Sequence, residues 1–191
     1  GLYSKIVTDG ITEREDHYYV SDFEISKYEI TQAEFHTIMP QDSTLTDAAL
    51  YASYPEEVSW VQAMEYCNER SIREGYAPAY DIARNLTLDK NGEVTFDLNK
   101  VEGYRLPSEI EWEIAAGEYT TTATNTEITE VGQNEPNANG LYDVYSNMRE
   151  WCMDWAAETA PIWMDMNTDT YNYSGEINKK LKGIARQSKE Y

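Results

Sequence analysis

The side chains that most often carry out chemistry in proteins are scarce in this sequence. It has two cysteines, Cys67 and Cys152, and two histidines, His17 and His36. Zinc sites take several cysteine or histidine ligands at short spacings, and the sequence has no C-x-x-C motif, so a histidine-rich zinc site is excluded. A nucleophilic triad would need one of the two histidines, and neither lies in a recognisable motif. Each lone thiol is typical of a small core residue, and a disulfide between the two cysteines is left open.

Carboxylates are abundant, but no pair of them stands out as catalytic. The 191 residues include 35 Asp and Glu against 15 Lys and Arg, which gives a formal net charge of −20. Such a charge argues against binding to nucleic acid or to an anionic membrane surface, and it favours the binding of cations. No apolar run approaches the roughly 20 residues of a membrane-spanning helix, so we expect no membrane insertion.

One acidic run has the spacing of a calcium-binding loop. In "DMNTDTYNYSGE", Asp165, Asn167, Asp169 and Glu176 fall where an EF-hand places its ligands 1, 3, 5 and 12. Thr170 occupies the position of the glycine that the turn needs, and no flanking helices are evident. We therefore interpret this spacing as chance.

Three short helices are predicted from their N-terminal capping boxes. In each box a Ser or Thr is followed three residues later by Glu or Gln, the pairs being Thr31–Glu34, Ser59–Gln62 and Ser108–Glu111. The second helix carries Trp60, Met64, Cys67 and Ser71 on one face, and Gly75 is its expected stop.

Strands are predicted in three segments. Residues 18–30 are rich in aromatic and β-branched residues and indicate one bent strand or two short ones. Residues 86–98 predict a hairpin around Asn91 and Gly92, and residues 141–145 resemble a strand. Strands and helices do not alternate as βαβα, so the expected fold class is α+β with little regular secondary structure. The 16 Tyr and 5 Trp against 3 Phe favour a loop-rich fold pinned by hydroxyl and indole hydrogen bonds over a dedicated aromatic binding face.

Four segments occur in an order that resembles one known family. They are "FEISKYEITQAEF", "PEEVSWVQAMEYCNERSIREG", "GYRLPSEIEWEIAAG" and "VGQNEPNANGLYDVYSNMREWCMDW". Together they resemble the formylglycine-generating enzyme (sulfatase-modifying factor) family, most clearly over residues 18–155. The resemblance implies a single domain over residues 1–191 that is incomplete at its C-terminal end, with a C-type lectin-like fold of short helices and twisted antiparallel strands. The same scaffold serves bacterial ligand-binding proteins, including the variable proteins of diversity-generating retroelements.

Two residues of "GYRLPSEIEWEIAAG" are expected to have structural roles. The planar guanidinium of Arg105 suits donation to several backbone carbonyls, so we expect it to tie coil segments together. We expect the ring of Trp112 to fill the core beneath the loops. Neither residue is predicted to take part in chemistry.

The segment "DVYSNMREW" is the best candidate for a functional site, because the matching segment of the family binds calcium. The resemblance implies four ligands: the side chains of Asp143 and Glu150 and the carbonyls of Ser146 and Met148. Calcium prefers such hard oxygens, and an ion held there would be structural. The family usually has glycine at position 146, which reaches positive φ more easily than serine does. The alternative is that the two carboxylates cap the loop or pair with Arg149.

Enzymes of this family oxidise a substrate cysteine to formylglycine with copper(I) held by two cysteines, which follow a late "RGGSW"-like segment. Paired thiolates are what copper(I) requires. Here the corresponding region reads "KLKGIARQSKEY", and no cysteine follows before Tyr191. Cys67 and Cys152 match structural cysteines of the family. Copper is therefore expected only if a further C-terminal segment supplies cysteines, and no residue is predicted to be catalytic.

Three functions are compatible with these observations, in this order. The first is a non-catalytic module that binds a protein or glycan ligand. The second is a formylglycine-generating oxidase whose copper-binding segment is absent from this sequence, and the third is a structural component of a bacterial surface or secretion assembly. A periplasmic or cell-surface location is favoured over the bacterial cytoplasm.

Overall fold

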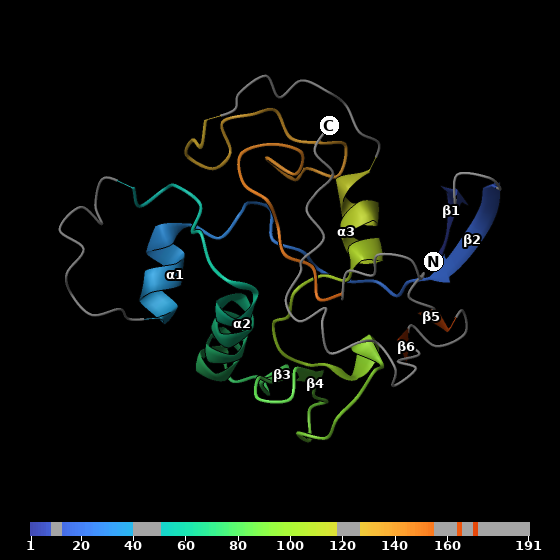
Figure 1. The fold of residues 1–191 in the computed structure, drawn as a ribbon. Coiled ribbons are helices and arrows are strands. Elements are labelled where there is room, and N and C mark those ends of the chain that lie inside the picture. The colour runs from blue at the N-terminus through green and yellow to red at the C-terminus, as the bar shows by residue number, and fades with distance from the viewer. Residues whose placement is uncertain (9–12, 40–50, 118–126, 155–163, 166–169, 172–191) are drawn as a thin grey trace.

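The computed structural model describes residues 1–8, 13–39, 51–117, 127–154, 164–165 and 170–171. Its elements are β1 (Leu2–Thr8), β2 (Glu13–Tyr19), α1 (Gln32–Ile38), α2 (Trp60–Glu74), β3 (Tyr80–Asp81), β4 (Leu86–Thr87), a 3-10 helix (Leu98–Lys100), α3 (Glu109–Ala116), β5 (Met164–Asp165) and β6 (Thr170–Tyr171). The strands pair only as antiparallel couples: β1 with β2, β3 with β4 and β5 with β6. Short helices and small antiparallel sheets joined by long coil confirm the predicted α+β class (Figure 1).

All three capping boxes are present, so the predicted helix starts are confirmed. In each, the Ser or Thr side chain accepts from the backbone N–H three residues later, and the Glu or Gln side chain accepts from the cap N–H. Helix α2 ends at Gly75, whose φ of 87° is in the left-handed region that glycine adopts cheaply. Arg73, in the last turn of α2, donates to the Thr37 and Ile38 carbonyls at 2.6 Å and so caps the end of α1.

The strands depart from the sequence predictions. Only Tyr18 and Tyr19 of residues 18–30 are in a strand, at the end of β2, and the β1–β2 hairpin was not foreseen. Residues 20–30, which we call the strap, run as coil from β2 to the isolated bridge at Thr31. The hairpin predicted at residues 86–98 is present in a short form: Leu88 and Val94 pair in an isolated antiparallel bridge around a tight turn at Gly92. The Thr95 N–H donates to the Thr87 carbonyl at 2.9 Å, and the Asp89 N–H donates to the Glu93 carbonyl at 2.8 Å.

The strand expected at residues 141–145 is wrong. This segment forms turns and bends instead. The Asn137 side chain accepts from the backbone N–H of Leu141 at 3.0 Å, and Asp143 takes a φ of 59°. Positive φ cannot continue an extended strand, so the local polar side chains decide the conformation.

The core forms along the predicted face of α2. Its central cluster is Trp60, Met64, Cys67, Ala79 and Tyr80, with Trp151 and other apolar residues packed against it. Two indole groups tie coil to this core, since the Trp60 ring donates to the Cys152 carbonyl at 3.0 Å and the Trp151 ring donates to the Val58 carbonyl at 2.8 Å. Indole hydrogen bonds thus hold irregular backbone in place, as the aromatic composition suggested.

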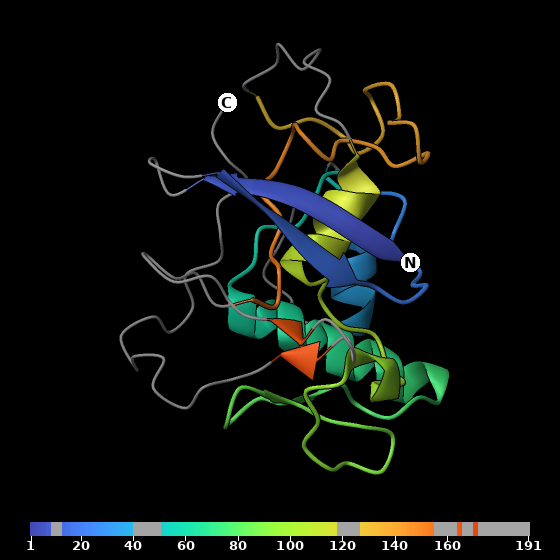
Figure 2. The ribbon, with the colours of Figure 1, turned by 90° about the vertical axis from the view of Figure 1, so that its right-hand side faces the viewer.

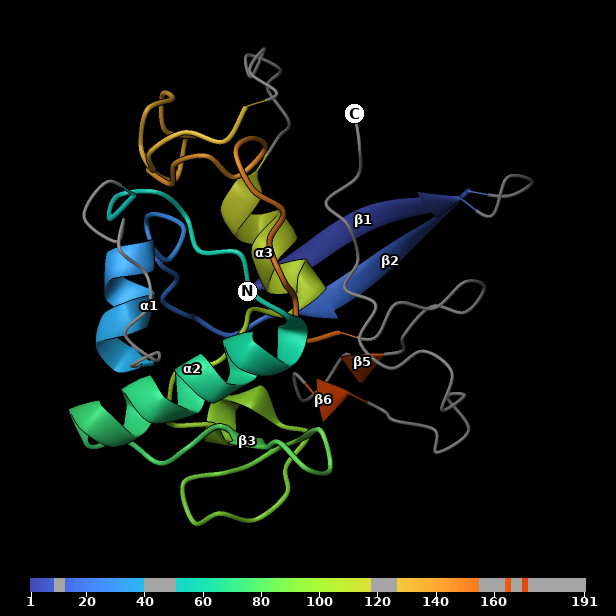
Figure 3. The same cartoon turned by 60° about the vertical axis from the view of Figure 1, so that its left-hand side comes forward.

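The β1–β2 hairpin lies against α3 and projects from one side of the molecule (Figures 2 and 3). One contact that holds it there is an ion pair between Lys5 and Glu113. The terminal amine of Gly1 and the backbone of Val20 also bond to each other at the open end of the hairpin. The faces of the hairpin differ, since Leu2 and Ile6 are exposed on the side away from Lys5.

Arg105 makes a bidentate ion pair with Glu111, the N3 residue of α3. The two guanidinium nitrogens donate to the two carboxylate oxygens at 2.7 and 2.6 Å, and the side chains are only 15% and 7% exposed. The same carboxylate accepts from the Ser108 N–H at 2.7 Å, which closes the capping box. Arg105 also donates to the Leu106 carbonyl at 3.1 Å, in keeping with the expected role of holding coil. The pairing with Glu111 was not foreseen, and a buried carboxylate is a strong partner for a guanidinium.

Gly103 allows the coil to approach α2 closely. A Cβ at this position would lie 2.2 Å from the Ala77 carbonyl oxygen and 2.5 Å from the Ser71 hydroxyl oxygen. That hydroxyl donates to the Cys67 carbonyl and accepts from the Tyr104 N–H, both at 2.7 Å. A glycine is required because any side chain would push the coil away from Ser71.

Replacement of Arg105 by alanine should lower the free energy of unfolding by about 3 kcal/mol, because it leaves the buried Glu111 carboxylate without its partner. Urea denaturation measures this change. The matched control is Arg84→Ala, since Arg84 pairs with Asp81 but its side chain is 63% exposed. That control should change stability by less than about 1 kcal/mol. Equal changes in the free energy of unfolding would show that the Arg105–Glu111 pair stabilises the fold no more than an exposed ion pair does.

Candidate calcium site and the adjoining cavity

The loop of residues 143–150 brings the four predicted calcium ligands into one short segment. Asp143 is 4% exposed, while Ser146, Met148 and Glu150 are partly buried. The backbone reaches positive φ at Asp143 (59°) and Asn147 (62°), and not at Ser146. Asp and Asn tolerate this region better than most residues. Serine in place of the family's usual glycine therefore causes no backbone conflict here.

The two carboxylates of the loop are held by different parts of the chain. Asp143 accepts from the Gly132 N–H at 2.6 Å and from the Asn134 amide at 2.7 Å. Glu150 accepts from the indole N–H of Trp112, on α3. Trp112 is only partly buried and packs edge-on against Tyr145, with ring centroids 5.7 Å apart. The expectation that its ring fills the core is therefore corrected: its role is to anchor Glu150.

A third carboxylate, Glu29 of the strap, also reaches this loop. It is 8% exposed, and its oxygens accept from the Met148 N–H at 2.9 Å and from the Asn147 amide at 2.6 Å. The sequence prediction missed it because Glu29 lies more than a hundred residues before the loop and belongs to no local motif there. The only available signal was its position just before the first capping box, in a segment that resembles the family.

These carboxylates disfavour one another's charge. The pKa of Glu29 is raised to about 7, mainly by burial. The hydrogen bonds from Met148 and Asn147 lower this pKa, and the charges of Glu150 and Asp143 raise it. Burial likewise raises the pKa of Glu150 to about 7, with a further contribution from Asp143 that the Trp112 hydrogen bond opposes. A cation beside Asp143 and Glu150 would relieve this repulsion.

The loop has the donors that a calcium ion needs. The Ser146 and Met148 carbonyls accept no hydrogen bond from any other described residue, so they are available to a cation. Within the described ranges, no three or more His, Cys, Asp or Glu side chains are grouped closely enough to hold a metal ion by themselves. A cation here would therefore be held by a pair of carboxylates together with main-chain carbonyls, a mixture that suits calcium. The EF-hand-like spacing at residues 165–176 lies largely outside the described residues.

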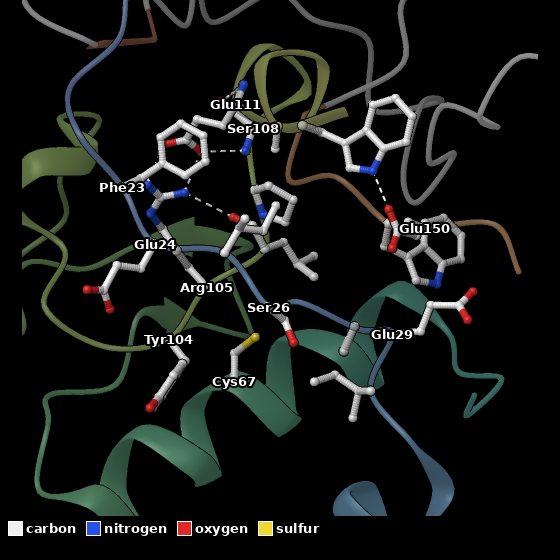
Figure 4. A pocket seen from close by; sticks show the side chains of 18 of the residues that line it. Phe23, Glu24, Ser26, Glu29, Cys67, Tyr104, Arg105, Ser108, Glu111 and Glu150 are labelled. Atoms are coloured by element: carbon white, nitrogen blue, oxygen red, sulfur yellow. Dashed lines mark hydrogen bonds and ion pairs between the residues drawn. The ribbon is translucent and has the colours of Figure 1, made fainter. Parts of the chain in front are cut away.

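A large cavity lies beside this loop, between the strap, α2 and the start of α3 (Figure 4). Its volume is about 770 Å³, and its walls mix apolar and polar groups. Arg105 and Glu111 form part of one wall and Cys67 projects from α2. Glu29 of the strap and Glu150 of the 143–150 loop also line the cavity. The size is within the usual range for a small-molecule or side-chain pocket.

The two cysteines do not fit a copper(I) site. Both are free and buried, and only Cys67 is among the residues that line the cavity. Burial raises the pKa of the Cys67 thiol to about 12 and also raises that of Cys152. Copper(I) binding requires thiolates that approach one ion together, and the environment of these side chains favours the neutral thiol.

Neither histidine lies in the cavity wall. The His17 ring shares a hydrogen bond of 2.7 Å with the Ser4 hydroxyl, because the register of the β1–β2 hairpin places these two residues opposite each other. His36 pairs with Glu56 at 3.5 Å on the first helix. Both histidines thus have a structural explanation.

This architecture is that of a C-type lectin-like domain. A solved structure of similar fold is Treponema denticola variable protein 1, with a TM-score of 0.51 and 24% identity over 81% of this chain and 77% of that chain. The family model for the sulfatase-modifying factor enzyme 1-like domain matches residues 7–123, and the chain belongs to this family.

Two relatives extend the comparison. The chain is 30% identical over 179 aligned residues to "Chaperone protein LppX" of Paenibacillus barcinonensis, a match that covers 71% of this chain and 63% of that protein. It is 40% identical over 68 residues to "Serine/threonine-protein kinase pkn1" of Chlamydia pneumoniae, which covers 28% of this chain and 11% of that protein. The chain therefore spans less than two thirds of the length of either relative. Within the part of the chain that the structure describes, no helix is long and apolar enough to cross a bilayer.

In the absence of metal, the stability of the protein should fall as pH rises from the ordinary carboxyl pKa of 4.5 to about 7 through the effect of Glu29 and Glu150. In this window the folded chain keeps protons that the unfolded chain has released, so raising the pH favours unfolding. Urea denaturation in EDTA at several pH values measures the trend. The Glu150→Gln variant should show a shallower fall than wild type, whereas Glu57→Gln, an exposed control, should not. A wild-type slope no steeper than that of Glu150→Gln would contradict the assignment.

Proposed function

We propose that this chain is a non-catalytic binding module, that its ligand is an extended segment of polypeptide, and that the ligand lies along the strap and inserts side chains into the adjoining cavity. The single observation that carries this proposal is the state of the strap backbone. Asp22, Phe23, Glu24 and Ile25 make no backbone hydrogen bond to any other described residue, although all four line the cavity.

A backbone segment with unpaired donors and acceptors beside a cavity offers the groups that strand-addition sites use. The main-chain groups supply affinity, and pockets for alternate side chains supply selectivity. Of these residues, Asp22 and Glu24 are exposed and Phe23 is partly buried, so a partner strand can reach the backbone. The strap carboxylates add a preference for a segment that contains Lys or Arg.

The comparisons support a binding role without defining its ligand. One relative is named a chaperone protein, and a protein of similar fold is named a variable protein. A polypeptide is favoured over a glycan because unpaired backbone groups match another backbone.

The strap hypothesis is tested with a matched pair of variants at one exposed position. Glu24→Pro removes a backbone donor that has no partner in the described structure, whereas Glu24→Ala removes only the side chain. Binding is measured with a display library of unstructured peptides, followed by fluorescence titration of the selected peptide. Glu24→Pro should weaken binding by about tenfold or more relative to Glu24→Ala, with little change in melting temperature.

Three results would count against the binding-module proposal. One is equal affinity of the two Glu24 variants for the selected peptide. Another is selective binding on a glycan array with no peptide selected. The third is tight copper(I) binding that is lost in Cys67→Ser, because it would point to the family's oxidase chemistry.

We also propose that the 143–150 loop binds one calcium ion through Asp143, Glu150 and the Ser146 and Met148 carbonyls. The ion would supply positive charge where buried carboxylates repel one another, and it would stabilise the loop. The ion has no part in any reaction in this proposal.

Calcium at about 100 times its Kd should raise the melting temperature of the wild-type chain by roughly 5–10 °C, as expected when a ligand binds only the folded state. Glu150→Gln should lose this response, because it removes a charged ligand, while Glu57→Gln should keep it. Thermal unfolding with CaCl₂, with MgCl₂ and with EDTA measures the effect. No calcium-dependent shift in the wild-type protein would rule out the site.

A further inference from the structure

From the contacts of Glu29 we infer that it is the positioning residue of the calcium loop: it sets the orientation of the Ser146 and Met148 carbonyls without itself binding the ion. This inference rests on the proposed calcium site. It concerns a carboxylate that lies on the strap, outside the loop, and that no sequence motif connects to the ligands.

The geometry places both oxygens of Glu29 on two consecutive loop residues. One oxygen accepts from the Met148 N–H at 2.9 Å, and the other accepts from the Asn147 side-chain amide at 2.6 Å. The two donors meet different oxygens of the carboxylate, whereas a glutamine would present its NH₂ group, a donor, to one of them. The charge of the acceptor also shortens and strengthens such bonds.

The bond to the Met148 N–H has a particular consequence for the ligands. This N–H belongs to the peptide unit between residues 147 and 148. The Ser146 carbonyl lies in the peptide unit before it, and the Met148 carbonyl lies in the peptide unit after it. Because each peptide unit is planar, the orientation of each neighbour relative to the central unit depends only on the φ and ψ angles of Asn147 and Met148. One carboxylate thus holds the peptide unit to which both proposed carbonyl ligands are joined.

Asn147 extends this restraint to a third segment. Its side-chain oxygen accepts from the Thr129 N–H at 2.8 Å, and its amide also donates to the Thr129 carbonyl at 3.2 Å. Its backbone has a φ of 62°, which the surrounding bonds must maintain. Glu29 therefore links the strap, residue 129 and the calcium loop through one network that exists without metal.

The same contacts argue that Glu29 is not a further ligand. Both of its oxygens point to donors on the loop, and no group of three acidic side chains among the described residues is close enough to hold a metal ion. Partners that orient metal ligands in this way commonly change metal affinity by about 10–100-fold when they are replaced.

The test combines local hydrogen exchange with calcium affinity. In EDTA, Glu29→Gln should speed amide exchange at Met148 by about tenfold or more, with core amides of α2 such as Cys67 unchanged. Isothermal titration should show calcium binding weakened by about 10–100-fold. Glu150→Gln, the ligand variant, should lose calcium affinity but keep the Met148 amide protected. Glu57→Gln should change neither quantity.

A second variant keeps the test decisive if Glu29→Gln folds poorly. Asn147→Gly removes the amide that Glu29 accepts from but tolerates the positive φ. This variant should speed amide exchange at Met148 and weaken calcium binding. Asn147→Asp should restore neither property, because its carboxylate would face the carboxylate of Glu29. Unchanged Met148 exchange in Glu29→Gln would overturn the inference. Loss of calcium binding with Met148 still protected would also overturn it, because Glu29 would then act as a ligand.

The outcome separates this inference from the calcium proposal. If the wild-type chain binds no calcium, the proposed ion site fails, and the exchange rate at Met148 still reports whether Glu29 orients the loop. If the wild type binds calcium and Glu29→Gln binds it equally well, the ion site stands and the positioning role of Glu29 fails.

Discussion

The bidentate ion pair between Arg105 and Glu111 joins the parts of this fold that have no regular structure. A guanidinium and a carboxylate that are both largely buried are favourable only when their remaining hydrogen-bonding groups are satisfied. Here they are, because Glu111 also closes the capping box of α3 through the Ser108 N–H, and Arg105 also donates to the Leu106 carbonyl. The start of α3, the coil before it and one wall of the cavity are therefore fixed together.

The position of α3 in turn organises the candidate site. Trp112, one residue after Glu111, donates its indole N–H to Glu150, and Glu113 pairs with Lys5 of the β1–β2 hairpin. The side-chain amides of Asn137 and Asn139 donate to backbone carbonyls at the end of α3, with nitrogen–oxygen distances between 2.9 and 3.2 Å. A short helix of eight residues thus connects the hairpin, the 143–150 loop and the coil before that loop.

Features set by neighbouring residues were predictable, and features set by distant contacts were not. The capping boxes and the buried face of α2 follow from side chains three or four positions apart, so they were correct. The strand expected at residues 141–145 was wrong because Asn137 and Asp143 impose turns there, and the ring of Trp112 proved to be a hydrogen-bond donor. The 143–150 loop was singled out through its resemblance to a family, whereas Glu29 was missed because only folding brings it to Met148.

The sequence alone determined where the helices begin, which face of α2 is buried, that the chain is strongly acidic, and which family it resembles, because these depend on local spacing and on composition. The tertiary structure alone decided which carboxylates meet. It places Glu29 from the strap beside a loop more than a hundred residues later, and it leaves the backbone of residues 22–25 without a partner among the described residues, beside a cavity. Such contacts depend on how coil segments pack around α2 and α3, and no periodicity in the sequence records that packing.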